Sequence, residues 1–211
     1  RKTPGADRMK YEVKICGLTR REDVEAAVEA GADYVGFVLA DFSPRHVTPE
    51  QLAVLTRDLP RHVKKVGVFV NAAKEFIFST VKTGSLDVVQ LHGEESAEFA
   101  RSLRGLTVWK AVHLTSLADV DFYASYPAER IVADAEAGGS GELSSWELAA
   151  ELAGRKRVML AGGISPGNAA EALRKVNPAG LDLASGVEES AGIKSKEKIV
   201  QLFQNIKGAV S

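Results

Sequence analysis

The chain has 211 residues, 45% of them hydrophobic, and carries 27 Lys and Arg against 28 Asp and Glu, a net charge of −1. This balance, with no Lys- or Arg-rich run, argues against a nucleic-acid partner, and the lone cysteine excludes an internal disulfide framework and a cysteine-based zinc cluster. Because the sequence shows neither a signal-peptide pattern nor an apolar run of about 18 residues, we expect a cytoplasmic protein without a membrane partner.

The chain is expected to form a single domain, because its Pro, Gly and Ser residues lie singly between periodic segments and no linker divides it. The first methionine is Met9, and we interpret residues 1–8 as an expression-tag remnant or a loose extension. Residues 9–211 are then the predicted folded domain.

Eight short runs rich in Val, Ile, Leu and Phe recur along the chain, with room for one helix and two loops between neighbours. They span residues 11–16, 33–39, 63–70, 87–91, 107–112, 130–134, 157–161 and 180–184. Almost wholly apolar runs are typical of parallel strands, which are buried on both faces. Eight such repeats predict an α/β fold, a closed (β/α)8 TIM barrel, and a doubly wound open sheet fits the same periodicity.

The segments between these runs are expected to be helical. The predicted helices span 20–31, 72–81, 94–103, 116–124, 144–152, 169–176 and 194–206, and a further one starts at Thr48-Pro49-Glu50-Gln51. That motif supplies an N-cap, a proline at N1 and a glutamine at N3, and Ser165-Pro166 is expected to open its helix in the same way. Because 116–124 has the weakest pattern, we expect a short or irregular fifth helix.

Polar side chains lie where several predicted strands end, which is the functional edge of either α/β architecture. Cys16 ends the first strand, and it is either a functional thiol or a small buried hydrophobe. A free thiol has a pKa of about 8.5, so a basic role for Cys16 would require nearby positive charge to favour its ionisation. Asp134 ends the sixth strand, where it either caps the following loop or acts as a general acid.

Two further residues with side chains suited to ligand binding follow strands. Arg45 comes after the second strand, where it is either a solvated loop charge or a bidentate ligand for a carboxylate. His92, at the end of the fourth strand, either caps the next helix or faces the ligand.

Glycine turns follow the last two predicted strands, at Gly162-Gly163 and at Ser185-Gly186. Such turns either permit only a sharp bend or let backbone amides approach an anion closely. Two of them in adjacent final units favour a phosphate site, which barrels of this kind often hold after strands seven and eight.

Seven motifs, in their order and spacing, resemble the phosphoribosylanthranilate isomerase family of tryptophan biosynthesis. They are Lys14-Ile15-Cys16-Gly17, Gly36-Phe37-Val38 with Ser43-Pro44-Arg45, Gly67-Val68-Phe69-Val70, Gln90-Leu91-His92-Gly93, Gly138-Gly139-Ser140-Gly141, Leu160-Ala161-Gly162-Gly163-Ile164 and Ser185-Gly186-Val187-Glu188. The resemblance implies a (β/α)8 barrel that converts N-(5'-phosphoribosyl)anthranilate to 1-(2-carboxyphenylamino)-1-deoxyribulose 5-phosphate, an Amadori rearrangement without cofactor or metal.

The resemblance also implies roles for individual residues. Cys16 takes the place of the general base, Asp134 that of the general acid, and Arg45 that of the ligand for the anthranilate carboxylate. Further substrate contacts are expected from the amides near Gly163 and Gly186, which would hold the phosphate, and from His92, Gly162, Asp182 and Ser185.

Three segments depart from the family pattern: Ala184 stands where a serine is expected, and Ala40-Asp41-Phe42 and Ser144-Ser145-Trp146 are atypical. Two other functions are therefore kept as alternatives. One is another phosphosugar-processing barrel enzyme, such as indole-glycerol-phosphate synthase or a ribulose-phosphate epimerase. The other is a non-catalytic barrel that binds a phosphorylated ligand. In each case the partner is a small phosphorylated molecule, and the sequence leaves both a monomer and a homodimer open.

Overall fold

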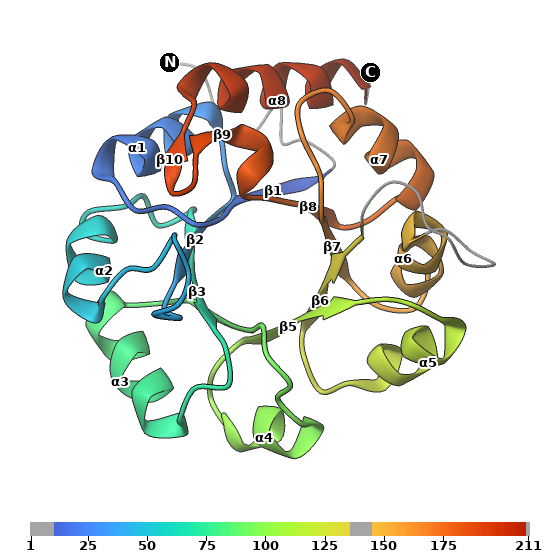
Figure 1. Cartoon of the computed structure of the whole chain (residues 1–211), viewed down its shortest axis with the longest axis horizontal. Helices are drawn as coiled ribbons and strands as arrows, with labels where there is room; N and C mark the ends of the chain where they lie inside the picture. The colour runs from blue at the N-terminus through green and yellow to red at the C-terminus, as the bar shows by residue number, and fades with distance from the viewer. Residues whose placement is uncertain (1–10, 136–144, 210–211) are drawn as a thin grey trace.

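A computed structural model describes residues 11–135 and 145–209, which form a closed barrel of eight parallel strands ringed by helices (Figure 1). The strands are β1 (Glu12–Ile15), β2 (Tyr34–Val38), β3 (Lys64–Phe69), β4 (Val88–Leu91), β5 (Val108–His113), β6 (Arg130–Asp134), β7 (Val158–Ala161) and β8 (Gly180–Leu183). Each strand pairs with its neighbours in the chain, and β1 closes the barrel on β8. The predicted TIM barrel is therefore confirmed, and the alternative of an open sheet is wrong.

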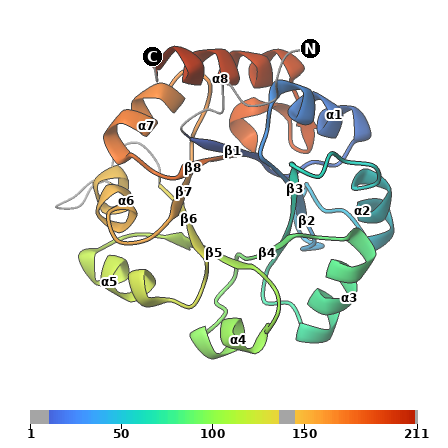
Figure 2. The ribbon, with the colours of Figure 1, turned by 180° about the vertical axis from the view of Figure 1, so that it is seen from behind.

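The helices form an outer ring, which Figure 2 shows from behind. They are α1 (Arg21–Ala30), α2 (Pro49–Leu55), α3 (Lys74–Gly84), α4 (Ala97–Ser102), α5 (Leu117–Ser125), α6 (Ser145–Ala153), α7 (Ala169–Val176) and α8 (Lys196–Ala209). Between β8 and α8 lie a short 3-10 helix, η1 (Ser185–Val187), and a hairpin of β9 (Glu188–Ser190) and β10 (Ile193–Lys194). This hairpin was not predicted. None of the helices in the described ranges is long and apolar enough to cross a membrane.

Two predictions fall outside the described residues. They are the tag remnant or loose extension at 1–8 and the glycine-rich motif at 138–141.

Local sequence signals account for several helix ends. The predicted capping box opens α2: the Thr48 hydroxyl accepts a hydrogen bond from the Gln51 backbone N–H at 3.2 Å, and Gln51 Oε1 accepts one from the Thr48 N–H at 2.8 Å. At the other end of a helix, α1 stops where Gly31 adopts a φ of +106°, a conformation that glycine tolerates without strain.

The fifth helix lies within one residue of its predicted span, 116–124, and it is regular. Helix α5 has nine residues and begins with a capping box between Ser116 and Asp119, which compensates for its weak apolar pattern. The shortest α-helix in the described ranges is α4, with six residues. It starts three residues later than predicted because Glu95 lies before it and accepts hydrogen bonds from the backbone N–H groups of Asn71 and Gly93.

The N-cap expected at Ser165 was also wrong. Helix α7 begins at Ala169, and Asn168 precedes it as N-cap. The Asn168 side chain turns back toward the loop, where Oδ1 accepts a hydrogen bond from the Ser165 N–H at 2.8 Å and Nδ2 donates one to the Gly163 carbonyl at 2.9 Å. Asn168 therefore fixes the turn that follows β7.

A charged cluster fills the amino-terminal end of the barrel, and we call its four residues, Glu12, Tyr34, Trp109 and Arg130, the plug. The Arg130 guanidinium lies 5.2 Å from the centre of the Tyr34 ring and 4.9 Å from that of Trp109, and it pairs with the Glu12 carboxylate. Arg130 is only 4% exposed. The charge is tolerated there because the carboxylate and the two rings replace water.

Candidate active site

We call the carboxyl-terminal end of the barrel the mouth. A cavity of about 370 Å³ opens there. It brings together three of the predicted site residues: Cys16 after β1, Arg45 after β2 and His92 after β4. The rest of its lining is mostly apolar and consists of Gly17, Val38, Ala40, Phe42, Ser43, Val68, Val70 and Ala184. An apolar wall with a few polar groups is typical of a site for a small organic molecule.

The geometry of β1 places Cys16 in this cavity. Its backbone N–H donates to the Leu183 carbonyl at 2.8 Å, which continues the β1–β8 pairing, and the residue as a whole is partly exposed. Gly36 on β2 makes room for it, since a Cβ atom there would lie 2.8 Å from Sγ. The position of the Cys16 side chain thus depends on a glycine in the neighbouring strand.

Beneath Cys16 lies a buried lysine to which the sequence analysis gave no role. Lys14 precedes Cys16 by two residues and so points to the same side of the sheet. Its Nζ donates to Asp182 Oδ2 at 2.7 Å and to Gln90 Oε1 at 2.8 Å. Asp182 Oδ1 has no hydrogen-bond partner among the described residues. A lysine within an apolar strand, at this spacing from the cysteine, is the signal that could have identified it.

The charges around Cys16 act in opposite directions on its ionisation. Burial raises the pKa of the thiol above its ordinary value, and the nearby ammonium of Lys14 offsets only part of this rise. Burial alone would lower the pKa of Lys14, but the Asp182 carboxylate more than compensates and leaves that pKa raised. The expected positive neighbour is therefore present and stays charged, while the thiol of the ligand-free protein is mainly protonated.

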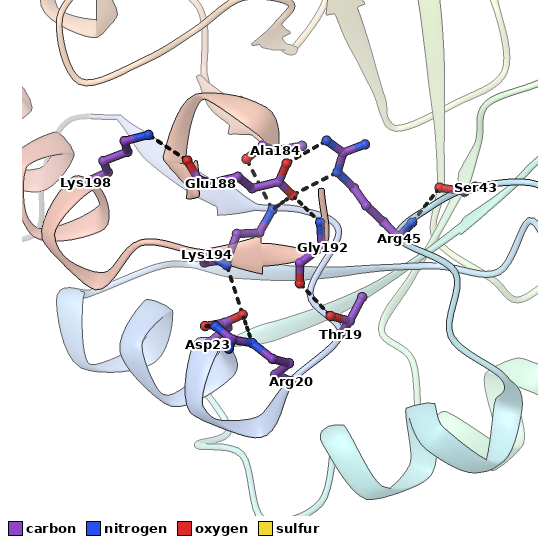
Figure 3. Close-up of polar contacts among 10 residues, drawn as sticks. All are labelled: Thr19, Arg20, Asp23, Ser43, Arg45, Ala184, Glu188, Gly192, Lys194 and Lys198. Atoms are coloured by element: carbon purple, nitrogen blue, oxygen red, sulfur yellow. Dashed lines mark hydrogen bonds and ion pairs between the residues drawn. The ribbon is translucent and has the colours of Figure 1, made fainter. Parts of the chain in front are cut away.

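Arg45 reaches the cavity from the loop after β2 and is held there by Glu188 of the unpredicted hairpin (Figure 3). Its Nε and Nη2 atoms donate to the two carboxylate oxygens of Glu188, at 2.8 and 2.6 Å. Gly17 adopts a φ of +73° beside it, and a Cβ atom there would touch Arg45 Cδ. Sequence reasoning missed Glu188, which lies 143 residues from its partner.

His92 lies at the end of β4, where its backbone N–H donates to the Phe69 carbonyl at 2.7 Å. Its Nδ1 is 3.4 Å from the Gln90 amide nitrogen. The surrounding protein, together with the positive charge of Lys14, lowers the pKa of His92, which favours the neutral imidazole.

Asp134 lies at the mouth but is not among the residues that line the cavity of Cys16. It is partly buried at the end of β6, and Gly162 at the end of β7 packs directly against it. Any side chain at Gly162 would overlap the Asp134 carboxylate and the backbone of Ala135. Glycine at 162 is therefore needed for Asp134 to occupy this position.

The two predicted phosphate turns lie side by side. Gly162 and Gly163 have φ values of +85° and +60°, so the chain turns sharply after β7. Gly186 in η1 packs against the Ile164 carbonyl so closely that a Cβ atom would overlap it. The structure thus gathers Gly162, Gly163 and Gly186 in one region with the adjacent, exposed Ser185.

No metal site is formed by the residues that the structure describes, in which no three His, Cys, Asp or Glu side chains lie close enough together to hold an ion.

Comparison with known proteins identifies the family. Residues 13–205 match the family model for N-(5'phosphoribosyl)anthranilate (PRA) isomerase. The chain belongs to this family. The N-(5'-phosphoribosyl)anthranilate isomerase of Trichlorobacter lovleyi is 42% identical to it over 204 residues, which cover 94% of this chain and 99% of that protein. The protein is therefore an isomerase.

Solved structures of the family have the same fold. The phosphoribosyl anthranilate isomerase of Thermus thermophilus superimposes with a TM-score of 0.85 at 42% identity, over 93% of this chain and 98% of that one. Another member, solved in complex with reduced 1-(o-carboxyphenylamino)-1-deoxyribulose 5-phosphate, gives a TM-score of 0.85 at 36% identity, over 94% and 99% of the two chains.

Proposed function

We propose that this isomerase converts N-(5'-phosphoribosyl)anthranilate to 1-(2-carboxyphenylamino)-1-deoxyribulose 5-phosphate in tryptophan biosynthesis, with Asp134 as general acid and Cys16 as general base. The observation that carries the proposal is the arrangement of the mouth. A thiol and an arginine share one apolar cavity, and two glycine turns lie at the same end of the barrel. The substrate has a matching order of groups: an aromatic carboxylate, a ribose and a phosphate.

The first step opens the ribose ring. A neutral carboxylic acid at Asp134 donates its proton to the ring oxygen while the bond from this oxygen to C1' breaks, and the anthranilate nitrogen becomes an iminium. Gly162 packs directly against Asp134 and fixes the place of its carboxyl group at the end of β6.

The second step moves a proton from carbon. The iminium acidifies the C2' proton, the thiolate of Cys16 removes it, and the resulting enolamine tautomerises to the ketone. The thiol must first lose its own proton, and the ammonium of Lys14 stabilises the anion that forms. Lys14 acts here through Cys16 and is a positioning residue.

The remaining predicted residues bind the substrate. Arg45 pairs with the anthranilate carboxylate, and the amides of the two glycine turns hold the phosphate. His92 lines the cavity and is suited to a ribose hydroxyl group. Asp182 does not line the cavity, but its buried Oδ1 is an acceptor without a partner among the described residues, and we propose it as a further substrate contact. Ala184 lines the cavity with a methyl group where the family pattern has a serine hydroxyl, so one polar contact is lost.

The test is an assay with N-(5'-phosphoribosyl)anthranilate that follows the loss of anthranilate fluorescence. The proposed function predicts turnover without added metal or cofactor. Another phosphosugar-processing barrel enzyme would leave this substrate unchanged, and a non-catalytic binding barrel would bind it without turnover. Either result would contradict the proposal.

We further propose that the enzyme acts in the cytoplasm on this small phosphorylated substrate, with neither nucleic acid nor a membrane as a partner. All the residues with proposed roles belong to one chain, so the reaction requires no second subunit. A monomer and a homodimer both fit this arrangement, and sedimentation of the active enzyme distinguishes them.

A further inference from the structure

The Arg45 guanidinium is bound along one of its two hydrogen-bonding edges by a carboxylate of the protein itself. Glu188 accepts from Nε at 2.8 Å and from Nη2 at 2.6 Å, a bidentate geometry that fixes the plane of the guanidinium (Figure 3). The Arg45 side chain is 23% exposed and that of Glu188 only 4%. The edge that Glu188 occupies is therefore closed to any other carboxylate.

The other edge of the guanidinium remains available. Arginine has five N–H donors, and Glu188 uses one on Nε and one on Nη2. Within residues 11–135 and 145–209, the hydrogen bonds of the Arg45 guanidinium come from Nε and Nη2 and none comes from Nη1. Because Arg45 lines the cavity, these free donors are the ones that an incoming carboxylate can reach.

A second cation holds Glu188 in place. Lys194 of β10 is fully buried, and its Nζ donates to Glu188 Oε1 at 2.7 Å and to the Ala184 carbonyl at 3.2 Å. The Gly192 N–H donates to the same Glu188 oxygen at 3.2 Å. Arg45 and Lys194 carry two positive charges against one negative charge on Glu188, so the group retains one net positive charge facing the cavity.

The hairpin itself is anchored to helix α1 through Asp23. The Lys194 backbone N–H donates to Asp23 Oδ2 at 3.0 Å, and Arg20 holds the Asp23 carboxylate through two hydrogen bonds of 2.9 and 2.7 Å. Figure 3 shows these contacts reaching from α1 to the guanidinium. The position of Glu188 is therefore set by the scaffold.

We propose that Glu188 is a positioning residue that fixes Arg45 so that its Nη1 edge faces the anthranilate carboxylate, and that this determines specificity for carboxylated substrates. The inference rests on the proposed function, in which Arg45 binds that carboxylate. It gives the β9–β10 hairpin, and with it Lys194, a role in substrate selection.

Glu188→Gln tests this, with Glu189→Gln as matched control, because Glu189 is the exposed neighbour and its substitution removes the same charge. Each variant is assayed with the natural substrate and with its aniline analogue, which lacks only the carboxylate. We expect Glu188→Gln to raise KM for the natural substrate about tenfold, with kcat nearly unchanged and KM for the analogue within twofold of wild type. An effect of charge alone would instead lower KM for the natural substrate, because the loss of the Glu188 charge makes the site more positive.

Several outcomes would overturn the proposal. A lower KM for the natural substrate would mean that Glu188 competes with the substrate for Arg45, and equal increases in KM for both substrates would mean a general structural role.

A double variant adds a further check: with Arg45→Ala already present, Glu188→Gln must leave KM unchanged. If Arg45→Ala itself does not discriminate between the two substrates, the carboxylate assignment in the proposed function fails. If only Glu188→Gln lacks an effect, the positioning role fails.

Discussion

The two ends of the barrel both bury charged side chains, but they differ in how completely those charges are satisfied. In the plug at the amino-terminal end, both Glu12 oxygens accept hydrogen bonds from Arg130, and Tyr34 and Arg157 donate to Glu12 as well. At the mouth, Lys14 donates to Asp182 and Gln90, yet Asp182 retains an acceptor without a partner among the described residues.

This difference separates residues that stabilise the fold from residues that can bind a ligand. A charge whose hydrogen-bonding capacity is filled by protein groups does not contact a ligand directly, whereas one with unused capacity can bind a ligand. The comparison implies that substitutions in the plug change the free energy of unfolding but not turnover, and that substitutions at the mouth do the reverse.

The largest effect is expected at Asp134. Asp134→Asn keeps the size of the side chain but removes the proton that opens the ring, so kcat should fall about 10²- to 10⁴-fold. Binding of a product analogue and the free energy of unfolding should stay close to wild type. Asp121→Asn, at a 72% exposed carboxylate, is the control. Parallel losses of analogue affinity and turnover would identify Asp134 as a binding residue instead.

Cys16→Ala is expected to reduce kcat by a similar factor, about 10²- to 10⁴-fold, because the proton on C2' then lacks its base. Since Cys16 must lose its proton while Asp134 keeps one, kcat/KM against pH should be bell-shaped for wild type, and the raised pKa of the thiol should set its alkaline limb. Residual activity of the variant should lack that limb. An unchanged pH profile in a folded variant would show that Cys16 only fills space.

The plug should respond in the opposite way. Arg130→Met leaves the partly buried carboxylate of Glu12 without its main partner, and the free energy of unfolding should fall by about 3 kcal/mol. Denaturant unfolding measures this loss, and the folded variant should retain wild-type kcat. Arg130→Lys keeps the charge but not the planar stacking on Tyr34 and Trp109, so it should lose less stability. A large decrease in kcat would show that the two ends are coupled.

The smallest effect concerns pH and Glu12. Burial alone would raise its pKa, but the hydrogen bonds and charge of Arg130 outweigh it and lower the pKa below the ordinary 4.5. The unfolded chain therefore binds this proton more readily, so the ion pair stabilises the fold above about pH 4.5 and loses that contribution as the pH falls further. Glu12→Gln should have a shallower loss of stability in acid. Identical acid transitions for the two proteins would contradict the assignment.

The sequence predicts the barrel well because its strands are apolar runs whose period and boundaries are local. Residues 130–134 and 169–176, for example, were predicted with the bounds that β6 and α7 have in the structure. Cys16, His92 and Asp134 could be proposed as site residues because each ends such a run.

The contacts that orient the site escaped prediction because they join distant segments. The hairpin strands have only three and two residues and mixed polarity, so neither gives a periodic pattern. Nothing local to Glu188 or Arg45 indicates that the two side chains meet. The start of α4 was predicted three residues too early for a related reason. Glu95 fits a helical pattern, but its carboxylate pairs with Lys110, a distant residue on β5.

The ion pair between Lys14 and Asp182 has a consequence for how the enzyme is made. It joins the first strand to the last across 168 residues. During translation Lys14 therefore leaves the ribosome long before its carboxylate partner has been made. A nascent chain that stops before residue 180 would hold a lysine without Asp182 to pair with it, next to Cys16. The barrel can close on β1, and Lys14 can reach its partner, only after β8 has been synthesised.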